Sequence, residues 1–400
     1  MATIPEGMRD VVPPETGELR AAEALLRARF AAYGYGEVIT PWLEFAETFE
    51  AADDDTLAGG YRLHDQQGHQ LMSRTDMTVP VARLAAARYN DRPLPLRFCY
   101  VAPSIRPWAP QRSQDGEFVQ AGAELLGVAS AAADAECVTL LCDCLATAGL
   151  RDYHIALGSV AFYGALVDSL GLDDEDTDKF LEALAERDYP MLESIAGNAH
   201  VDADALKVVW RVLELGGSRD GLAQARKLAS TPAMDGAIRH LVQVREHVEE
   251  AGFADVVTLD FGLYPTLSYY SGVIFEAYAP GVGLPIATGG RYDGLVERFD
   301  WDVPAAGFAV ALDRLLDAMA EAGVPPVTAP SCLSFSGGLE EPARAAELRR
   351  AGLAVAALPE GVPGPRPWLR RDGGRYVLET AEGAAFSGGW RDVRRALGVE

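Results

Sequence analysis

The sequence predicts an α+β fold, in which an antiparallel sheet is flanked by helices and accompanied by a helical insertion and a small C-terminal β/α module. Strand-like segments joined by hairpin-like loops stand between helical segments, an order that favours an antiparallel sheet over a doubly wound one. Residues 160–250 show almost only helical patterns, and the proline-rich run GVPPVTAPS marks a boundary near residue 325. We therefore expect one domain over residues 1–325 and a separate module over residues 326–400.

The first elements are a helix, an extended strand and a second helix. An amphipathic helix fits residues 15–33, because Leu19, Ala22, Leu26, Phe30 and Tyr33 recur at spacings of three and four. Two glycines end this helix, and EVITPWLEF follows as a strand that runs into an extended, proline-marked segment. The segment QLMSRTDMTVPVARLAAARY then predicts a short strand, a polar turn and a helix.

Two strands and a helix form the middle of the predicted sheet domain. PLRFCYVAPSIRP and GEFVQAGAELLG are expected to be strands joined by a long polar loop, the second turning into irregular chain at its end. A helix at ADAECVTLLCDCLATAG and a strand at YHIALGS precede the insertion, where acidic stretches such as LDDEDTDKFLEAL favour helix N-termini.

Strands resume after the insertion. The expected strands are VVTLDFG, VIFEAY and GLPIAT, and PAAGFAVALDRLLDAMAEAG is typical of a strand that runs into a helix. In the C-terminal module, CLSFSGG and LAVAALP predict strands on either side of the helix EEPARAAELRRAG.

Composition and charge indicate a globular cytoplasmic protein that does not bind nucleic acid. The apolar fraction is 49%, no run of about 18 apolar residues predicts a membrane span, and the N-terminus does not resemble a signal peptide. The formal net charge is −24, and residues 331–400 carry 10 Arg against 9 Asp and Glu, so the acidity lies in the main body. Such a surface repels nucleic acid. Five scattered cysteines suit a reducing compartment.

Three motif-like places are expected to be structural, so we predict no metal and no cofactor. Cys142 and Cys144 lie in the apolar helical run LLCDCLATAG without a partner pair, which favours a core position over a metal site. The glycine-rich stretches ATGGRYDG and FSGG match neither GxGxxG after a strand nor GxxxxGK[ST], so they are weak phosphate loops.

Five further segments resemble the catalytic domain of histidyl-tRNA synthetase, a class II aminoacyl-tRNA synthetase. They are SRTDMTVPVAR, RFCYVAPSIRPWAPQRSQDGEFVQAGAELLG, LSYYSGVIFEAY, GGRYDGL and GFAVALDRL, in that order. PEGMRDVVP and GYGEVITPWLE match the family's opening segments, so the resemblance covers roughly residues 4–325. It implies a class II synthetase-like fold for this domain.

The resemblance also implies a pocket for free histidine. Asp76, Thr78 and Gln120 would face the amino group of the ligand, and Arg106 would face its carboxylate. These residue types suit the task, because an ammonium group needs acids or amides and a carboxylate needs a donor.

The imidazole end of the implied pocket consists of Glu124 with Tyr269 and Tyr270. Glu124 and Gln120 lie four apart, so strand alternation would put both on one face. A structural ion pair between Arg106 and Glu124 is the alternative for two of these charges, because buried charges are costly unless paired.

Other positions depart from the synthetase pattern in a way that removes positive charge. Pro265 stands where the family's synthetases hold an arginine that stabilises the reacting phosphate, and Trp108 stands where an acid reads adenine. The following loop, RSQDGEF, carries Asp115 and Glu117 where the family has basic residues. Arg314 remains at the position of the family's motif 3 arginine.

A synthetase-like body without adenylating groups resembles the regulatory subunits of short-form ATP phosphoribosyltransferases. Membership of that branch implies a non-catalytic chain that forms a homodimer core. It also implies that this core joins the short catalytic subunit in a hetero-octamer, with histidine as the effector. The tail of about 75 residues is shorter than the anticodon-binding domain of about 100 residues in the synthetases and has no net basic face. A histidyl-tRNA synthetase, or a synthetase-like enzyme with a degenerate ATP site, is the alternative.

Overall fold

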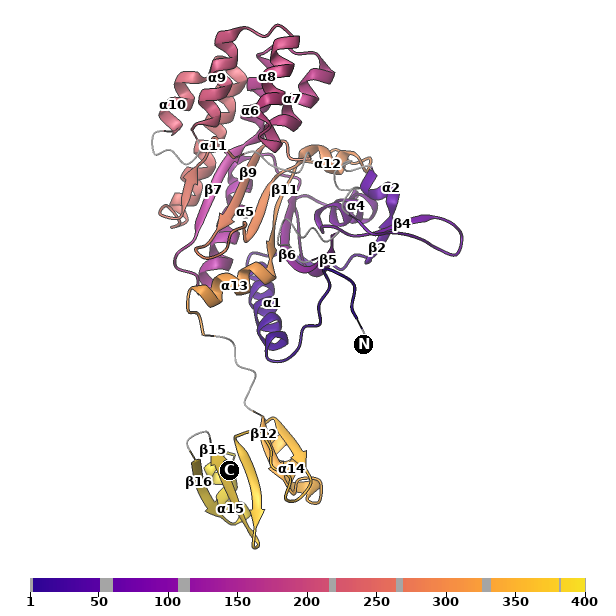
Figure 1. The fold of residues 1–400 in the computed structure, drawn as a ribbon, viewed down its shortest axis with the longest axis vertical. Coiled ribbons are helices and arrows are strands. Elements are labelled where there is room, and N and C mark those ends of the chain that lie inside the picture. Colours follow the sequence, from indigo (N-terminus) through magenta and orange to yellow (C-terminus); the bar gives the residue numbers. More distant parts are fainter. Residues whose placement is uncertain are drawn as a thin grey trace. The chain divides into compact units, whose positions relative to one another are not determined.

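The computed structural model in Figure 1 describes residues 3–50, 60–106, 116–215, 221–263, 269–325, 332–380 and 383–399. By its internal contacts the chain divides into two compact units. The first comprises residues 1–11 and 19–325, and the second comprises residues 12–18 and 326–400.

An eight-stranded sheet is the centre of the first unit, in the order β1-β5-β6-β11-β10-β9-β7-β8. Its strands are β1 (Gly36–Glu37), β5 (Leu96–Ile105), β6 (Glu117–Leu126), β7 (His154–Ser159), β8 (Val257–Leu259), β9 (Val273–Tyr278), β10 (Ala287–Arg291) and β11 (Ala305–Ala311). The predicted antiparallel arrangement is confirmed from β5 to β7, whereas each edge strand, β1 and β8, runs parallel to its neighbour.

Helices and a small sheet surround this large sheet. The helices are α1 (Glu15–Ala32), α2 (Ala46–Glu50), α4 (Thr78–Tyr89), α5 (Ala131–Thr147), α12 (Asp293–Glu297) and α13 (Leu312–Glu321). The small sheet has the order β2-β4-β3, with β2 (Leu43–Phe45), β3 (Arg62–His64) and β4 (Gln70–Ser73). The predicted helix at residues 15–33 is thus confirmed, and Cys142 and Cys144 are buried in α5 as core residues.

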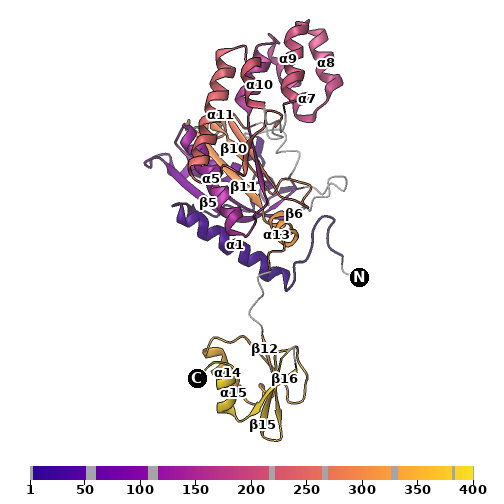
Figure 2. The same cartoon turned by 90° about the vertical axis from the view of Figure 1, so that its left-hand side faces the viewer.

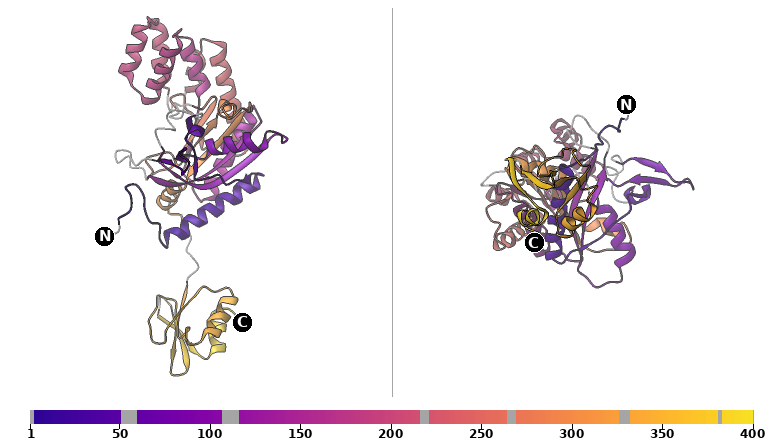
Figure 3. Two further views of the ribbon diagram at one scale, coloured as in Figure 1. Left: turned by 90° about the vertical axis from the view of Figure 1, so that its right-hand side faces the viewer. Right: turned by 90° about the horizontal axis from the view of Figure 1, so that it is seen from below.

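The insertion at 160–250 is helical, as predicted. It contains α6 (Val160–Asp168), α7 (Asp174–Glu186), α8 (Tyr189–Asn198), α9 (Ala203–Leu213), α10 (Gly221–Leu228) and α11 (Pro232–Glu250). Asp173, Asp188 and Asp202 accept hydrogen bonds from the free backbone N–H groups of α7, α8 and α9, which fixes where these helices begin. Figures 2 and 3 show α7–α10 grouped beyond one end of the sheet. In the parts of the chain that the structure describes, no helix is long and apolar enough to cross a membrane.

Strand β6 separates the hydrophobic core from the opposite face of the sheet. Ala121, Ala123 and Leu125 belong to the core cluster that α1, α5 and α11 cover, whereas Gln120 and Glu124 point to the other face. The expected irregular end of this segment is wrong. β6 stays regular through Leu126 because β5 and β11 bond to its two edges over most of its length.

Strand β10 begins later than predicted. The sequence predicts a strand at GLPIAT, whereas β10 comprises ATGGR at 287–291. The glycine-rich stretch that was considered as a phosphate loop is therefore a buried strand. The glycines are needed here because a Cβ at Gly290 would lie within 3 Å of the Val273 carbonyl oxygen and the Tyr270 ring. A sequence pattern that is typical of loops therefore serves close packing across a sheet.

A buried ion network ties β10 to two helices. The Arg291 guanidinium lies 2.6 Å from Asp134 of α5 and 2.9 Å from Asp293, and both Arg291 and Asp134 are almost fully buried. His240 of α11 lies 2.6 Å from the second oxygen of Asp134. Removing Arg291 or Asp134 alone would leave the other as a poorly compensated buried charge, which costs about 3–5 kcal/mol.

The second unit contains a five-stranded sheet with the order β13-β12-β14-β15-β16 and two helices. Its elements are β12 (Leu333–Ser336), α14 (Pro342–Arg350), β13 (Val355–Leu358), β14 (Trp368–Asp372), β15 (Arg375–Thr380), β16 (Gly383–Gly388) and α15 (Trp390–Ala396). Its own core packs around Phe335, Tyr376 and Trp390, whose rings lie within 6.1 Å of one another.

We predict that Gly122→Ala lowers the free energy of unfolding by about 1–3 kcal/mol. The added Cβ would meet the buried Tyr100 hydroxyl and the Phe308 carbonyl oxygen at distances that atoms do not adopt. Gly164→Ala on α6 is the control, because its Cβ would meet nothing within 4 Å. Urea unfolding followed by circular dichroism measures both, and equal stability of the two variants would contradict the assignment of this close contact.

Candidate functional site

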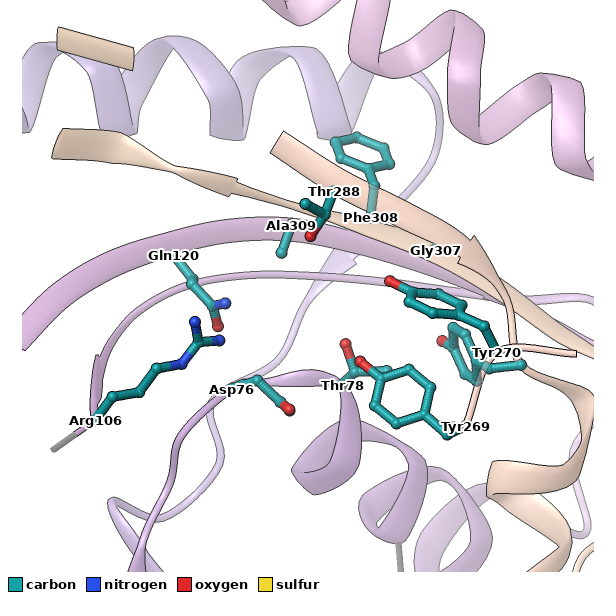
Figure 4. Close-up of a pocket in the computed structure, with 11 residues that line it drawn as sticks. Asp76, Thr78, Arg106, Gln120, Tyr269, Tyr270, Thr288, Gly307, Phe308 and Ala309 are labelled. Carbon is teal, nitrogen blue, oxygen red and sulfur yellow. The ribbon is translucent and has the colours of Figure 1, made fainter. Parts of the chain in front are cut away.

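A partly open pocket lies against the face of the sheet opposite the main core. Six of the seven predicted binding residues line it: Asp76, Thr78, Arg106, Gln120, Tyr269 and Tyr270. They come from the start of α4, the end of β5, strand β6 and the chain before β9. In Figure 4, Arg106 and Gln120 lie at one end, the tyrosines at the other, and Asp76 and Thr78 between them.

Glu124, the seventh predicted residue, lies directly behind the lining of this pocket. Its carboxyl is fully buried and accepts hydrogen bonds from the hydroxyls of Thr78 (3.0 Å), Tyr100 (3.3 Å) and Tyr292. Burial raises the pKa of Glu124 to about 8, although these three hydrogen bonds act in the opposite direction. Gly307 makes room for the carboxyl, because a Cβ at that position would overlap Oε2.

Asp76 is a second buried carboxyl in the pocket. Its Oδ1 accepts the backbone N–H of Val79 at 3.2 Å, a bond within the first turn of α4. Burial raises the pKa of Asp76, while hydrogen bonds and the positive charge of Arg106 act to lower it. Two desolvated carboxyls therefore face one small space, an arrangement that favours a cationic ligand.

Arg106 lies at the rim of the pocket and does not form the alternative ion pair with Glu124. Its Nε donates to the carbonyl oxygen of Thr75 at 3.0 Å, and its guanidinium lies 4.8 Å from the centre of the Phe118 ring. Among the residues with described positions, no carboxylate lies within ion-pair distance of this guanidinium. The charge is thus held in place by a backbone oxygen and a ring, which leaves donors for an anionic group.

Three tyrosines make the aromatic end of the pocket. The ring centroids of Tyr269 and Tyr270 are 4.9 Å apart, and those of Tyr269 and Tyr292 are 5.9 Å apart. Burial raises the pKa of all three phenols, so they stay neutral donors and acceptors.

Sequence reasoning missed five residues that line the pocket, and Tyr100 behind it; the five are Thr288, Tyr292, Gly307, Phe308 and Ala309. Tyr292 lies within GGRYDGL, one of the segments that resemble the family. The match to that segment is the signal that could have identified Tyr292 as a site residue. Tyr100 follows the alternation of β5, because it faces Gly122 across the ladder and so shares a face with Glu124. Thr288 and Gly307 carry no comparable signal, since small residues are common in any strand.

The positions that depart from the synthetase pattern lie mostly outside the described residues. These are Pro265, Trp108 and Asp115, whereas Glu117 begins β6. Arg314 lies near the start of α13 and donates to the Pro285 carbonyl oxygen at 2.7 Å. Burial lowers the pKa of Arg314, and the positive charge of Arg106 lowers it further. The two guanidiniums therefore lie close enough to interact electrostatically.

Comparisons with known proteins identify the family of this chain. The family model for histidyl-tRNA synthetase matches residues 7–315. The ATP phosphoribosyltransferase regulatory subunit of Moorella thermoacetica is 38% identical, over 88% of this chain and 91% of its own length. That of Symbiobacterium thermophilum is 37% identical, over 88% of this chain and 90% of its own.

Solved structures give the same assignment. The crystal structure of an ATP phosphoribosyltransferase regulatory subunit/histidyl-tRNA synthetase from Bacillus halodurans matches with a TM-score of 0.79 at 30% identity, covering 91% of this chain and 94% of that one. Histidyl-tRNA synthetase from Nostoc sp. PCC 7120 shares the fold, with a TM-score of 0.78 at 18% identity over 98% of this chain and 99% of that one. The chain belongs to the histidyl-tRNA synthetase family and, within it, to the ATP phosphoribosyltransferase regulatory subunits.

Proposed function

We propose that this chain is a non-catalytic subunit that binds histidine, activates a short-form ATP phosphoribosyltransferase catalytic subunit and mediates its feedback inhibition in the first step of histidine biosynthesis. The observation that carries the proposal is the pocket, which gathers the Arg106 guanidinium, the Asp76 carboxyl and a cluster of tyrosines, with the Glu124 carboxyl directly behind its lining. The names of the curated relatives support the same role. The chain would act in the cytoplasm, next to its partner.

Histidine has one group for each part of the pocket. Its carboxylate would meet Arg106, and its ammonium would meet Asp76, Thr78 and Gln120. Its imidazole would lie among the tyrosines, where hydroxyl groups can serve either ring nitrogen and the ring faces provide apolar contact. The Asp76 carboxyl would then gain a partner of opposite charge, which offsets the cost of its burial.

The sequence argues against a catalytic role for this pocket. Adenylation develops negative charge at a phosphate and needs fixed cations. Pro265, Trp108 and the acidic loop residues Asp115 and Glu117 each replace a group that would attract or orient ATP in the synthetases. Catalysis would therefore reside in the partner chain.

Feedback inhibition requires that histidine bind two states of the complex with different affinity. A pocket built from the start of α4, strands β5, β6, β10 and β11 and the chain before β9 is suited to this, because a relative shift of any one of them changes the ligand contacts. The catalytic subunit would respond to that shift through its contacts with this chain, in an assembly that we expect to be a hetero-octamer.

A homodimer core is part of this proposal, and an exposed apolar sheet face supports it. Phe45, Leu71 and Leu63 stand side by side across β2, β4 and β3, and Phe45 and Leu63 are 53% and 43% exposed. Leu43 and Tyr61 extend the same face and are also exposed. Soluble chains rarely expose such rows without a partner, and a second copy is the occupant we propose.

A histidyl-tRNA synthetase activity is the second candidate, because Arg106 and Arg314 both remain near the pocket. Fixed cations of this kind stabilise the negative charge that develops on a reacting phosphate. The experiments below separate this candidate from the first.

We predict that the purified chain raises the activity of a short-form phosphoribosyltransferase and makes that activity sensitive to histidine. The measurement is the initial rate of ATP condensation with phosphoribosyl pyrophosphate, with and without this chain, while histidine is titrated. The catalytic subunit alone is the control and should show a lower rate without histidine inhibition. Equal rates and equal histidine response in both samples would contradict the proposal.

We predict no histidine-dependent ATP–pyrophosphate exchange by the chain alone, and none by its Pro265→Arg variant. A single restored cation does not replace the other missing groups, because Trp108 and the acidic loop remain. A bona fide histidyl-tRNA synthetase is the positive control. Exchange clearly above background in the unmodified chain would favour the synthetase candidate.

We predict that Arg106→Ala weakens histidine binding about 10- to 100-fold, the loss expected for one charge-assisted hydrogen-bond pair. Arg88→Ala is the matched control, since Arg88 is an exposed arginine at the end of α4 and removes the same charge away from the pocket. Isothermal titration calorimetry measures both variants. Similar dissociation constants for the two would place the ligand carboxylate elsewhere.

A further inference from the structure

The environment of Glu124 has a feature that the binding of histidine alone does not explain. The carboxyl is fully buried, yet its three side-chain partners are hydroxyl groups, and no cation is in contact with it in the described part of the chain. Hydroxyls both donate and accept, so this cradle can hold the carboxyl in its ionised form or in its protonated form. A guanidinium or ammonium partner would have fixed the ionised form.

Two of these hydroxyls also face the pocket. Thr78 and Tyr292 line the cavity while they bond to Oε1 and Oε2 of Glu124, respectively. When Glu124 is ionised, both hydroxyls donate to it and present lone pairs to the cavity, which suits a ring with N–H groups to give. When Glu124 is protonated, one hydroxyl is released to donate into the cavity, which suits a ring nitrogen without a proton.

We propose that Glu124 and the imidazole of bound histidine hold one proton between them, so that histidine binding takes up a proton on the alkaline side of neutrality. The proton is either on the carboxyl, beside a neutral ring, or on the ring, beside a carboxylate. Because the carboxyl is buried, the forms with two protons or none would leave an unpaired charge. This inference rests on the proposed function, because it requires histidine in this pocket.

The direction of the pH dependence follows from the free components. The pKa of Glu124 is raised to about 8, mainly by burial, and free imidazole has a pKa of about 6.5. Between these values the free carboxyl is protonated and the free ring is neutral, so binding moves no proton. Above pH 8 the free pair holds none and must take one up, so affinity falls. Below about pH 6.5 the free pair holds two and must release one, so affinity falls again.

Other titratable groups face Glu124 from the surrounding elements. They are Asp76 before α4, Tyr100 on β5, Cys137 on α5, Tyr269 and Tyr270 before β9, and Tyr292 after β10. Burial raises the pKa of every one of these phenols and of the thiol, so they stay neutral in the range of interest. Asp76 and the α-amino group of the ligand are common to the wild type and to variants of Glu124, so a ratio of affinities removes their contribution.

The experiment compares the wild-type chain with Glu124→Gln, which keeps the shape and hydrogen-bonding capacity of the side chain but cannot hold the shared proton. Histidine is titrated by calorimetry from pH 6.5 to pH 9 in two buffers of different ionisation enthalpy. The wild-type dissociation constant, divided by that of the variant, should be flat below pH 7 and rise about fivefold between pH 8 and 9. At pH 8.5 the wild type should take up about three quarters of a proton more than the variant.

Three results would decide the matter. A ratio that stays flat to pH 9, with equal proton uptake, overturns the shared proton but leaves the proposed function intact. Absence of histidine binding by the wild type at pH 7.5 overturns the proposed function and this inference with it. If Glu124→Gln does not bind histidine, the Tyr292→Phe variant is measured instead. The Tyr292 hydroxyl lowers the pKa of Glu124, so its removal should move the alkaline fall in histidine affinity to higher pH. A fall at the same pH as in the wild type overturns the inference.

Discussion

The burial of one carboxyl, that of Glu124, is the constraint on which the site depends. A buried carboxyl without partners costs several kcal/mol, so the fold must bring hydrogen-bond donors to it. The three donors come from the first turn of α4, the middle of β5 and the end of β10. These elements are far apart in sequence, and satisfying Glu124 fixes their relative positions to within a hydrogen-bond length. The pocket is the space left between them.

The register of the sheet explains why that space is open. Glu124 on β6 stands opposite Gly307 on β11, which stands opposite Gly290 on β10. With no side chains at these two glycines, the carboxyl occupies the place of one missing Cβ and the Tyr270 ring approaches the other. A shift of one residue in the pairing of β6 with its neighbours would turn Glu124 into the hydrophobic core. Gly289 and Gly290 also make the sequence of β10 resemble that of a loop.

Local rules predicted much of the fold, and they failed where distant partners decide the structure. Helix periodicity and acidic N-caps located α1 and the insertion, and alternation placed Gln120 and Glu124 on one face. The edge strand β8 lies within the predicted VVTLDFG, whereas β1 could not be predicted, because it has two residues and is a strand only through its pairing with β5. In the site, Tyr292 bonds to a residue 168 positions away, and no local pattern encodes that contact. The family resemblance predicted the residues that line the ligand pocket. The hydroxyl groups that surround Glu124 behind this lining could be identified only from the three-dimensional structure.

Strand β10 gives the pocket a physical route to the helical insertion. Successive residues of its end point to opposite faces of the sheet, so Tyr292 reaches Glu124 while Arg291 reaches the buried Asp134. Asp134 in turn holds His240 of α11, a helix of the insertion. A ligand that moves the Tyr292 hydroxyl therefore acts on a backbone whose neighbouring residue is locked into a buried ion network. The pair of Arg291 and Asp134 resists displacement, because separating these two buried groups would leave a charge without its partner. For a chain whose proposed task is to report that histidine is bound, these contacts are a continuous physical connection from the pocket wall to a helix of the insertion.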